Sequence, residues 1–436
     1  MRLIVIFLII SFSFKIPKAT ELNIIRDAEI ENFLSEIANE LLKDTKIKNY
    51  NLNFYLDNKN YVNALVIPGP NFFFTTKLLI ESKSIDQIAG VVAHELGHVI
   101  GGHFTKMNQA RSSSSIVSII SSILAIGAAA GGSAEAASAI MLGGQHLSQA
   151  NLLSFSRSQE SFADQTSIRL LKKSGFSLEG MIDLFKLLER REKFKQYNPY
   201  SLTHPLSSKR KNNIKMHLMD QNNLKEFPRL NQRFALVKAK LNGFFLSQDR
   251  LEYIYPEINS LESFYAYSLR YYRIGKVKEA IKLLNKCIEI QPNNAFFFEL
   301  KGQIFFENGN IPEAIKSFKK AIDILPSEKS FKLFLAKSLY YKGDWHSYDK
   351  SIKLLWSFIK DDDFPVDAWH YLGLNFSKIK KLDYSSYAFA EKFYLVNQLK
   401  NARIHISKVK KLSKETIMEK RSNNFFKICS KTMTSK

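Results

Sequence analysis

The sequence has 436 residues, 45% of them hydrophobic, which is enough to bury the cores of two or three domains. Its two cysteines, Cys287 and Cys429, are too few for a disulfide-built fold. The formal net charge of +22 comes from lysines spread along the whole chain, and the absence of one basic block interleaved with aromatic residues argues against nucleic-acid binding. Two interpretations of this charge stay open: attraction to an anionic membrane surface, or a solvated surface without a partner.

The N-terminal stretch is typical of an export signal. The twelve residues from Leu3 to Phe14 are apolar apart from two serines, and they follow a basic residue. Such a run is too short to span a bilayer but fits the apolar core of a signal peptide. We therefore predict a signal peptide over residues 1–19. The absence of a nearby cysteine argues against a lipid anchor.

Two stretches that follow are typical of β-strands. In residues 51–56, Leu52, Phe54 and Leu56 alternate with polar neighbours, and residues 71–76 form a second such run after a Pro-Gly-Pro turn. They predict a small antiparallel sheet. An edge strand of such a sheet can pair with an extended substrate backbone without demanding a particular sequence.

The most informative motif is His-Glu-x-x-His, formed by His94, Glu95 and His98 inside an apolar run. On a helix, residues four apart lie on one face, so the two imidazoles can bind a single metal ion. Glu95 follows the first ligand directly and can take a proton from a water molecule. The motif therefore predicts a zinc hydrolase site on a buried helix.

A catalytic zinc site usually needs a third protein ligand. The metzincin pattern would place a histidine at Phe104, but the nearby histidine is His103, one residue too early. On a continuing helix, His103 would lie about 140° from His98 and face away from the metal. We expect it at a helix end or on the surface.

A better third ligand is Glu160, which shares one helical face with Asp164. In a gluzincin arrangement the glutamate binds zinc, while the aspartate accepts a hydrogen bond from a ligating imidazole and fixes its tautomer. A solvated acidic helix face is the alternative interpretation of this pair.

Together these elements resemble the gluzincin group that includes the HtpX-type and prenyl-protein-processing zinc proteases. The resemblance extends over roughly residues 22–215 and includes the segment Thr203-His204-Pro205 and Arg210. It implies one Zn²⁺ per chain, amide hydrolysis, and stabilisation of the developing oxyanion by the metal with Arg210 or His204 nearby. The expected metal ligands are His94, His98 and Glu160; Asp164 orients a ligand, and Glu95, His204 and Arg210 are the catalytic residues.

His204 allows two hypotheses. A histidine on a loop can act as a reversible fourth ligand that silences the resting enzyme and swings away when a client engages. Pro205 disfavours helix at His204, so we expect the side chain to be presented from an extended segment. Alternatively, His204 binds substrate or stabilises the oxyanion.

Between the two ligand-bearing elements lies a segment, residues 112–152, rich in Ile, Ala, Ser and Gly. Its uncharged part is too short for a comfortable membrane span, and glycines interrupt it. We interpret it as a helical hairpin or lid that can make peripheral contact with a membrane, with a buried structural hairpin as the alternative.

A repeat begins beyond residue 260. Gly275, Gly309 and Gly343 are spaced 34 residues apart, as are Pro292 and Pro326, which is the tetratricopeptide period. A further, degenerate repeat begins at a Trp-x-x-Leu-Gly motif, so we expect three or four units.

We therefore predict a mainly α protein in which a zincin-type α+β metalloprotease domain with a small antiparallel sheet precedes an α-solenoid of tetratricopeptide repeats. The expected layout is a signal peptide (1–19), a protease domain (20–220), a linker (221–260), the repeats (261–400) and a basic tail (401–436).

The combination of a zinc protease domain with C-terminal repeats resembles the periplasmic β-barrel assembly-enhancing proteases. The resemblance implies a periplasmic endopeptidase that acts on misfolded or stalled outer-membrane proteins and contacts their assembly machinery through the repeats. A repeat-based chaperone or scaffold with a dormant protease site is the alternative. Since the chemistry lies before residue 215, deleting residues 261–400 is expected to spare cleavage of short peptides.

Overall fold

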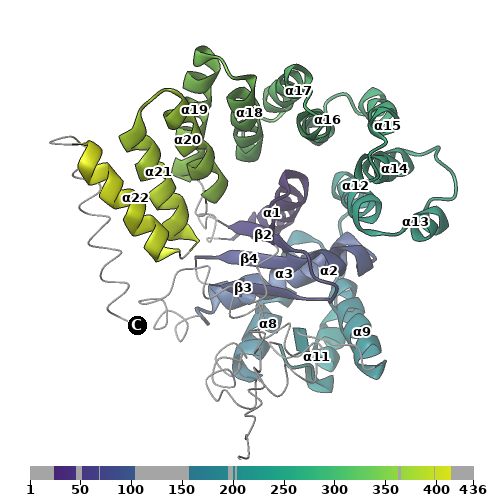
Figure 1. Ribbon diagram of the computed structural model, residues 1–436. Helices are drawn as coiled ribbons and strands as arrows, with labels where there is room; N and C mark the ends of the chain where they lie inside the picture. Colours follow the sequence, from purple (N-terminus) through teal and green to yellow (C-terminus); the bar gives the residue numbers. More distant parts are fainter. Residues whose placement is uncertain are drawn as a thin grey trace, which may run out of the picture.

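The computed structural model describes residues 24–45, 52–67, 69–103, 157–194, 200–201, 204–361, 365–396 and 398–413. The predicted signal peptide, segment 112–152, Thr203 and Cys429 lie outside the described residues. An α+β unit and an arc of paired helices make up the described chain (Figure 1). No described helix is long and apolar enough to cross a membrane.

The sheet is mixed, and the prediction that it is antiparallel throughout was wrong. Its strands are β1 (Ile24–Ile25), β2 (Asn53–Asp57), β3 (Ala64–Ile67) and β4 (Asn71–Thr75), in the order β1-β2-β4-β3. Strand β3 was not predicted, because its four buried apolar residues show no alternation. Strands β3 and β4 are antiparallel neighbours, and β4 lies between β3 and β2, parallel to β2.

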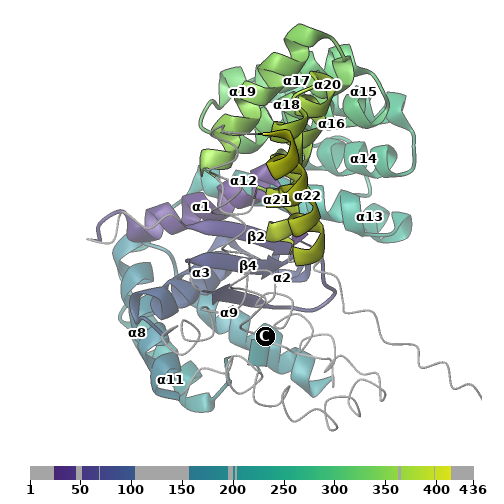
Figure 2. The ribbon, with the colours of Figure 1, turned by 60° about the vertical axis from the view of Figure 1, so that its left-hand side comes forward.

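The helices of this unit surround one buried helix that carries the His-Glu-x-x-His motif. They are α1 (Ala28–Leu42), α2 (Thr76–Glu81), α3 (Ile85–Ile100), α8 (Arg157–Ser174), α9 (Glu179–Lys193) and α11 (Ser208–Met219). Helix α3 bears the motif and is buried over nearly its whole length, which explains its continuous apolar sequence. In Figure 2, α1 lies between the sheet and the repeats, while α8, α9 and α11 lie on the opposite side of the sheet.

The arc consists of helix pairs with the predicted tetratricopeptide period, which confirms the solenoid. The pairs are α14 (Leu261–Arg273) with α15 (Val277–Ile290), α16 (Ala295–Glu307) with α17 (Ile311–Ile324), α18 (Lys329–Lys342) with α19 (Trp345–Asp361), and α20 (Val366–Lys378) with α21 (Leu382–Leu395). The turns inside the first three pairs contain Gly275, Gly309 and Gly343, all with positive φ. In the fourth turn Lys380 adopts a φ of 60°, a conformation that favours glycine.

The residues expected to form a linker, 221–260, contain two helices, α12 (Pro228–Phe245) and α13 (Gln248–Ile254). Helix α12 belongs to both cores: Phe234 and Leu241 pack in the core of the α+β unit, whereas Leu236 and Ala239 pack in that of the first repeats. At the far end of the arc, α22 (Leu399–Leu412) extends the ordered helices into the predicted tail.

Candidate functional site

Helix α3 holds the two histidines of the motif in a dry environment. Ser84 caps the helix, because its side chain accepts a hydrogen bond from the Gln87 N–H. His94, Glu95 and His98 are all buried. The Nε2 atoms of His94 and His98 lie 3.2 Å apart, so both rings point to one place, as the spacing predicts.

Helix α8 brings a carboxylate to these histidines. A Cβ on Gly97 would lie 2.7 Å from the Ala163 Cα, so only glycine allows α3 and α8 to approach this closely. The Glu160 carboxylate then lies 3.4 Å from His94 Nε2 and 3.3 Å from His98 Nε2. This is the position that a third metal ligand requires.

His204 completes the cluster. Its Nδ1 lies 3.0 Å from Glu160 Oε1 and 3.3 Å from His94 Nε2, and its Nε2 lies 3.4 Å from Glu95 Oε1. The His204 N–H donates to the Tyr200 carbonyl at 2.7 Å. The Tyr200 ring stacks on the imidazole at a centroid distance of 4.6 Å.

These residues fit a metal ion. One ligand atom from each of His94, His98, Glu160 and His204 lies within 4.8 Å of the others, and all four side chains are buried. Nitrogen and carboxylate oxygen donors are the set that zinc accepts. Burial opposes a positive charge on His94, but Asp164 and Glu160 outweigh it and raise the pKa of His94 to about 9. The site therefore attracts a cation.

Glu95 lies beside this cluster without being part of it. Neither of its carboxylate oxygens accepts a hydrogen bond from the described residues, although the side chain is fully buried. Burial raises the pKa of Glu95 above its ordinary value, while the nearby His204 and His94 oppose the rise. A carboxylate with a raised pKa next to a metal site is suited to accept a proton from water and pass it on.

Arg210 contacts two carboxylates of the site. Its Nε and one terminal nitrogen donate to Asp164 at 2.6 and 2.8 Å, and its other terminal nitrogen lies 2.6 Å from Glu160. Asp164 Oδ1 in turn lies 3.1 Å from His94 Nδ1, the atom whose protonation it is predicted to fix. Arg210 thus contacts a predicted metal ligand and can orient it, and its catalytic role stays a prediction.

His103 lies just past the end of α3 and is partly exposed, as expected of a helix-end residue. Its Nδ1 lies 3.0 Å from Nδ1 of His98, on the side of that ring opposite to the cluster. Helix α3 ends at Gly101, and the chain then turns back through Gly102 with a φ of 60°. This turn brings the His103 ring back against His98, a contact that the sequence did not predict.

Two contacts at the site were not predicted from the sequence: the stacking of Tyr200 on His204 and the approach of His103 to His98. The Gly101-Gly102 pair could have indicated the turn at His103, because glycine commonly ends helices. For Tyr200 the only signal is its spacing of four residues from His204, which is too weak to single it out.

A buried pair of helical histidines, a glutamate from a second helix and an adjacent buried glutamate define a metallopeptidase-type centre. Residues 26–217 match the sequence profile of Peptidase family M48, so this part of the chain is an M48 peptidase domain. Residues 250–321 match the profile described as Anaphase-promoting complex, cyclosome, subunit 3.

Several curated proteins are similar to the chain. The Beta-barrel assembly-enhancing protease of Yersinia pestis is 25% identical over 296 residues, covering 64% of this chain and 59% of the relative. The protein of the same name from Escherichia coli K12 is 25% identical over 300 residues, with the same coverage. The Metalloprotease YcaL of E. coli K12 is 32% identical over 137 residues, 31% of this chain and 51% of the relative. The chain thus spans less than two thirds of the length of these relatives.

Among solved structures, that of MamA is similar to the repeat-containing chain with a TM-score of 0.30 and 17% identity. The similarity covers 38% of this chain and 95% of MamA.

Proposed function

We propose that the protein is an exported zinc endopeptidase that hydrolyses misfolded or stalled outer-membrane proteins in the periplasm. The observation that carries this proposal is the buried four-residue cluster with Glu95 at its side. The similarity to proteins named Beta-barrel assembly-enhancing protease supports the envelope role.

In this proposal His94, His98 and Glu160 hold the metal. Zinc, when bound there, supplies a Lewis acid that polarises the substrate carbonyl and makes water more acidic. Glu95 accepts the proton from the attacking water and delivers it to the leaving amine, a role that its raised pKa favours. Asp164 and Arg210 keep the ligands oriented.

Strand β3 is the edge strand on which substrate would bind in this proposal. It contacts helix α3, and its four residues are buried, so a client pairs with it only when the chain that covers it moves aside. An extended client backbone can add to such an edge through main-chain hydrogen bonds, which give affinity for many sequences. This suits a quality-control protease, because unfolded clients share a backbone and not a sequence.

His204 restrains the enzyme in this proposal. Its Nδ1 lies within 3.3 Å of His94 Nε2 and Glu160 Oε1, while its Nε2 faces Glu95 at 3.4 Å. One ring can therefore fill the fourth ligand position and also cover the general base. The competing role, stabilisation of the oxyanion, requires the same ring to move aside and contact substrate.

The test compares variants of the purified protein for zinc content and for degradation of unfolded casein, with and without a chelator. Glu95→Gln is expected to keep about one zinc per chain and lose hydrolysis, because Glu95 is a base and not a ligand. Glu160→Ala is expected to lose both. Full zinc occupancy in Glu160→Ala would contradict the ligand set, and undiminished hydrolysis by Glu95→Gln would contradict the mechanism.

A second candidate function is a repeat-based scaffold or chaperone for outer-membrane proteins. The observation that favours it is the length of the solenoid, which runs from α14 to α22 and is larger than recognition of a short peptide needs. If Glu95→Gln restores outer-membrane protein assembly in cells that lack the protein, the scaffold carries the function and the proteolysis does not.

A further inference from the structure

The repeats contain a cavity that the peptidase site does not use. It has a volume of about 470 Å³ and lies between α17, α18 and α19, that is, between the second helix of one repeat and both helices of the next. This volume falls within the range of small-ligand sites. The apolar part of its lining consists of Ile315, Leu335, Leu339 and Leu354, with Pro312 at one end.

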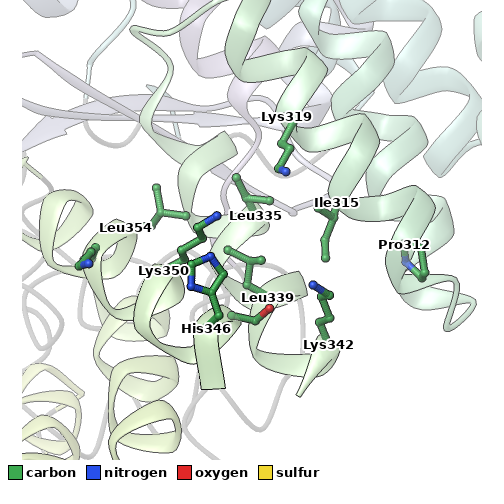
Figure 3. Close-up of a pocket in the computed structure, with 11 residues that line it drawn as sticks. Pro312, Ile315, Lys319, Leu335, Leu339, Lys342, His346, Lys350 and Leu354 are labelled. Carbon is green, nitrogen blue, oxygen red and sulfur yellow. The ribbon is translucent and has the colours of Figure 1, made fainter. Parts of the chain in front are cut away.

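Basic side chains surround this apolar floor. Lys319, Lys342 and Lys350 come from three different helices, and Figure 3 shows their amines around Leu339, with His346 beside Lys350. A fourth lysine also lines the cavity but pairs with an aspartate on its own helix.

Neighbouring carboxylates neutralise only part of the charge around the cavity. Lys342 contacts Asp344 at 3.2 Å, a pair in which both side chains are about half exposed. Within the described part of the chain, Lys319 and Lys350 form no ion pair. The amines of these lysines therefore attract anions at long range. The apolar floor beside them can pack against an apolar group of the same ligand.

We propose that this cavity binds an acidic peptide segment of a partner protein, in which an apolar side chain is flanked by carboxylates. The apolar side chain packs on Leu335 and Leu339, and the flanking carboxylates pair with Lys319 and Lys350. The amines favour a peptide over a single phosphate headgroup because they project from three helices on different sides of the floor, whereas one headgroup would need them gathered at one point.

The test measures binding of a labelled, end-blocked peptide, Glu-Asp-Leu-Leu-Asp-Glu, to the full chain by fluorescence anisotropy. Replacing the four acids by their amides, or the two leucines by serines, is expected to weaken binding at least tenfold. The paired substitution Lys319→Glu with Lys350→Glu is expected to weaken it at least as much. Ile315→Ser, at a half-buried position of the floor, tests the apolar contribution without opening the core.

The matched control is Lys320→Glu with Lys360→Glu. Both residues are exposed, lie on α17 and α19, and do not line the cavity, and the charge changes by the same amount. Binding within twofold of the unaltered protein is expected. Equal loss in both pairs would show a general charge effect and overturn the proposal.

Lipid is the competing ligand. If Lys319→Glu with Lys350→Glu abolishes co-sedimentation with phosphatidylglycerol vesicles while the peptide never binds, the site serves a membrane and the proposal is wrong. Because these measurements report binding and not hydrolysis, the Glu95→Gln protein must give the same results, which separates this proposal from the proposed peptidase function.

Discussion

Gly101 controls the position of His103, and its replacement gives a sharp test of the metal site. A Cβ on Gly101 would lie 2.3 Å from Nε2 of His103, 2.7 Å from Cε1 and 2.8 Å from Cδ2. Contacts this short cannot persist, so Gly101→Ala must displace the ring of His103. The displacement breaks the 3.0 Å contact between the Nδ1 atoms of His103 and His98.

The expected magnitude follows from the role of that contact. A hydrogen bond to the far nitrogen of a ligating histidine fixes its tautomer and orientation, and its loss typically lowers metal affinity about 10–100-fold, or about 1.4–2.8 kcal/mol. His103→Ala should give the same loss. Because both changes remove one contact, the double variant should lose no more than either single variant.

Gly102→Ala is the matched control. Gly102 has a φ of 60°, and an added Cβ would meet no atom within 4 Å. The change therefore costs about 1–2 kcal/mol of backbone strain and leaves His103 in place. Zinc affinity, measured by competition with a fluorescent chelator, should fall for Gly101→Ala and His103→Ala only. Unchanged affinity in His103→Ala would refute the reasoning.

Three further predictions concern restraint and stability. His204→Ala should raise basal degradation of an unfolded substrate if His204 is an inhibitory ligand, whereas reduced turnover with unchanged zinc content would exclude that role. Lys240→Met removes a buried cation that lies 3.2 Å from Glu29, and should destabilise the chain by about 3–5 kcal/mol, seen as a lower Tm; an unchanged Tm would contradict it. Gly309→Ala, at a φ of 75° with no atom within 4 Å of the new Cβ, should cost about 1 kcal/mol, and Lys380→Gly should gain about 0.5–1 kcal/mol. Denaturant unfolding measures both, and equal signs for the two changes would contradict the strain argument.

The sequence was most informative where the site depends on local periodicity. His94 and His98 face one point because of their spacing on a helix, and Glu160 and Asp164 do so for the same reason. Helical spacing cannot show which helices touch. The close approach of α3 and α8 requires glycine at position 97. This requirement can be recognised only from the structure, which places Ala163 against Gly97.

The features that the sequence did not predict depend on how the chain turns and packs, which periodicity alone does not show. His103 contacts the site because α3 stops at Gly101. Arg210 binds Asp164 and Glu160 because α11 packs beside α8, and a cation buried next to two carboxylates is drawn to them before any substrate arrives. Strand β3 was missed because burial on both faces removes the alternation that marks a strand.

The junction between the two units rests on helix α12, whose apolar residues occupy two faces. Such a helix resembles a charged linker in sequence, because neither face alone gives a long apolar stripe. Its buried Lys240 lies 2.8 Å from Asp27 at the start of α1, and Tyr265 of the first repeat donates to Glu29 at 2.6 Å. The first repeat is therefore hydrogen-bonded directly to α1, the helix that covers the peptidase core.

This junction changes what a deletion of residues 261–400 would report. The deletion removes Tyr265 and leaves Leu236 and Leu251, both buried against the first repeats, exposed to water. Each exposed leucine costs about 1.5–3 kcal/mol, and Glu29 loses a buried hydrogen bond as well. A truncated chain that fails to cleave peptides would then show instability of α12 and α1, not a catalytic role of the repeats. Point substitutions at the cavity, which leave α12 covered, separate recognition from catalysis because they remove the binding groups and keep the fold.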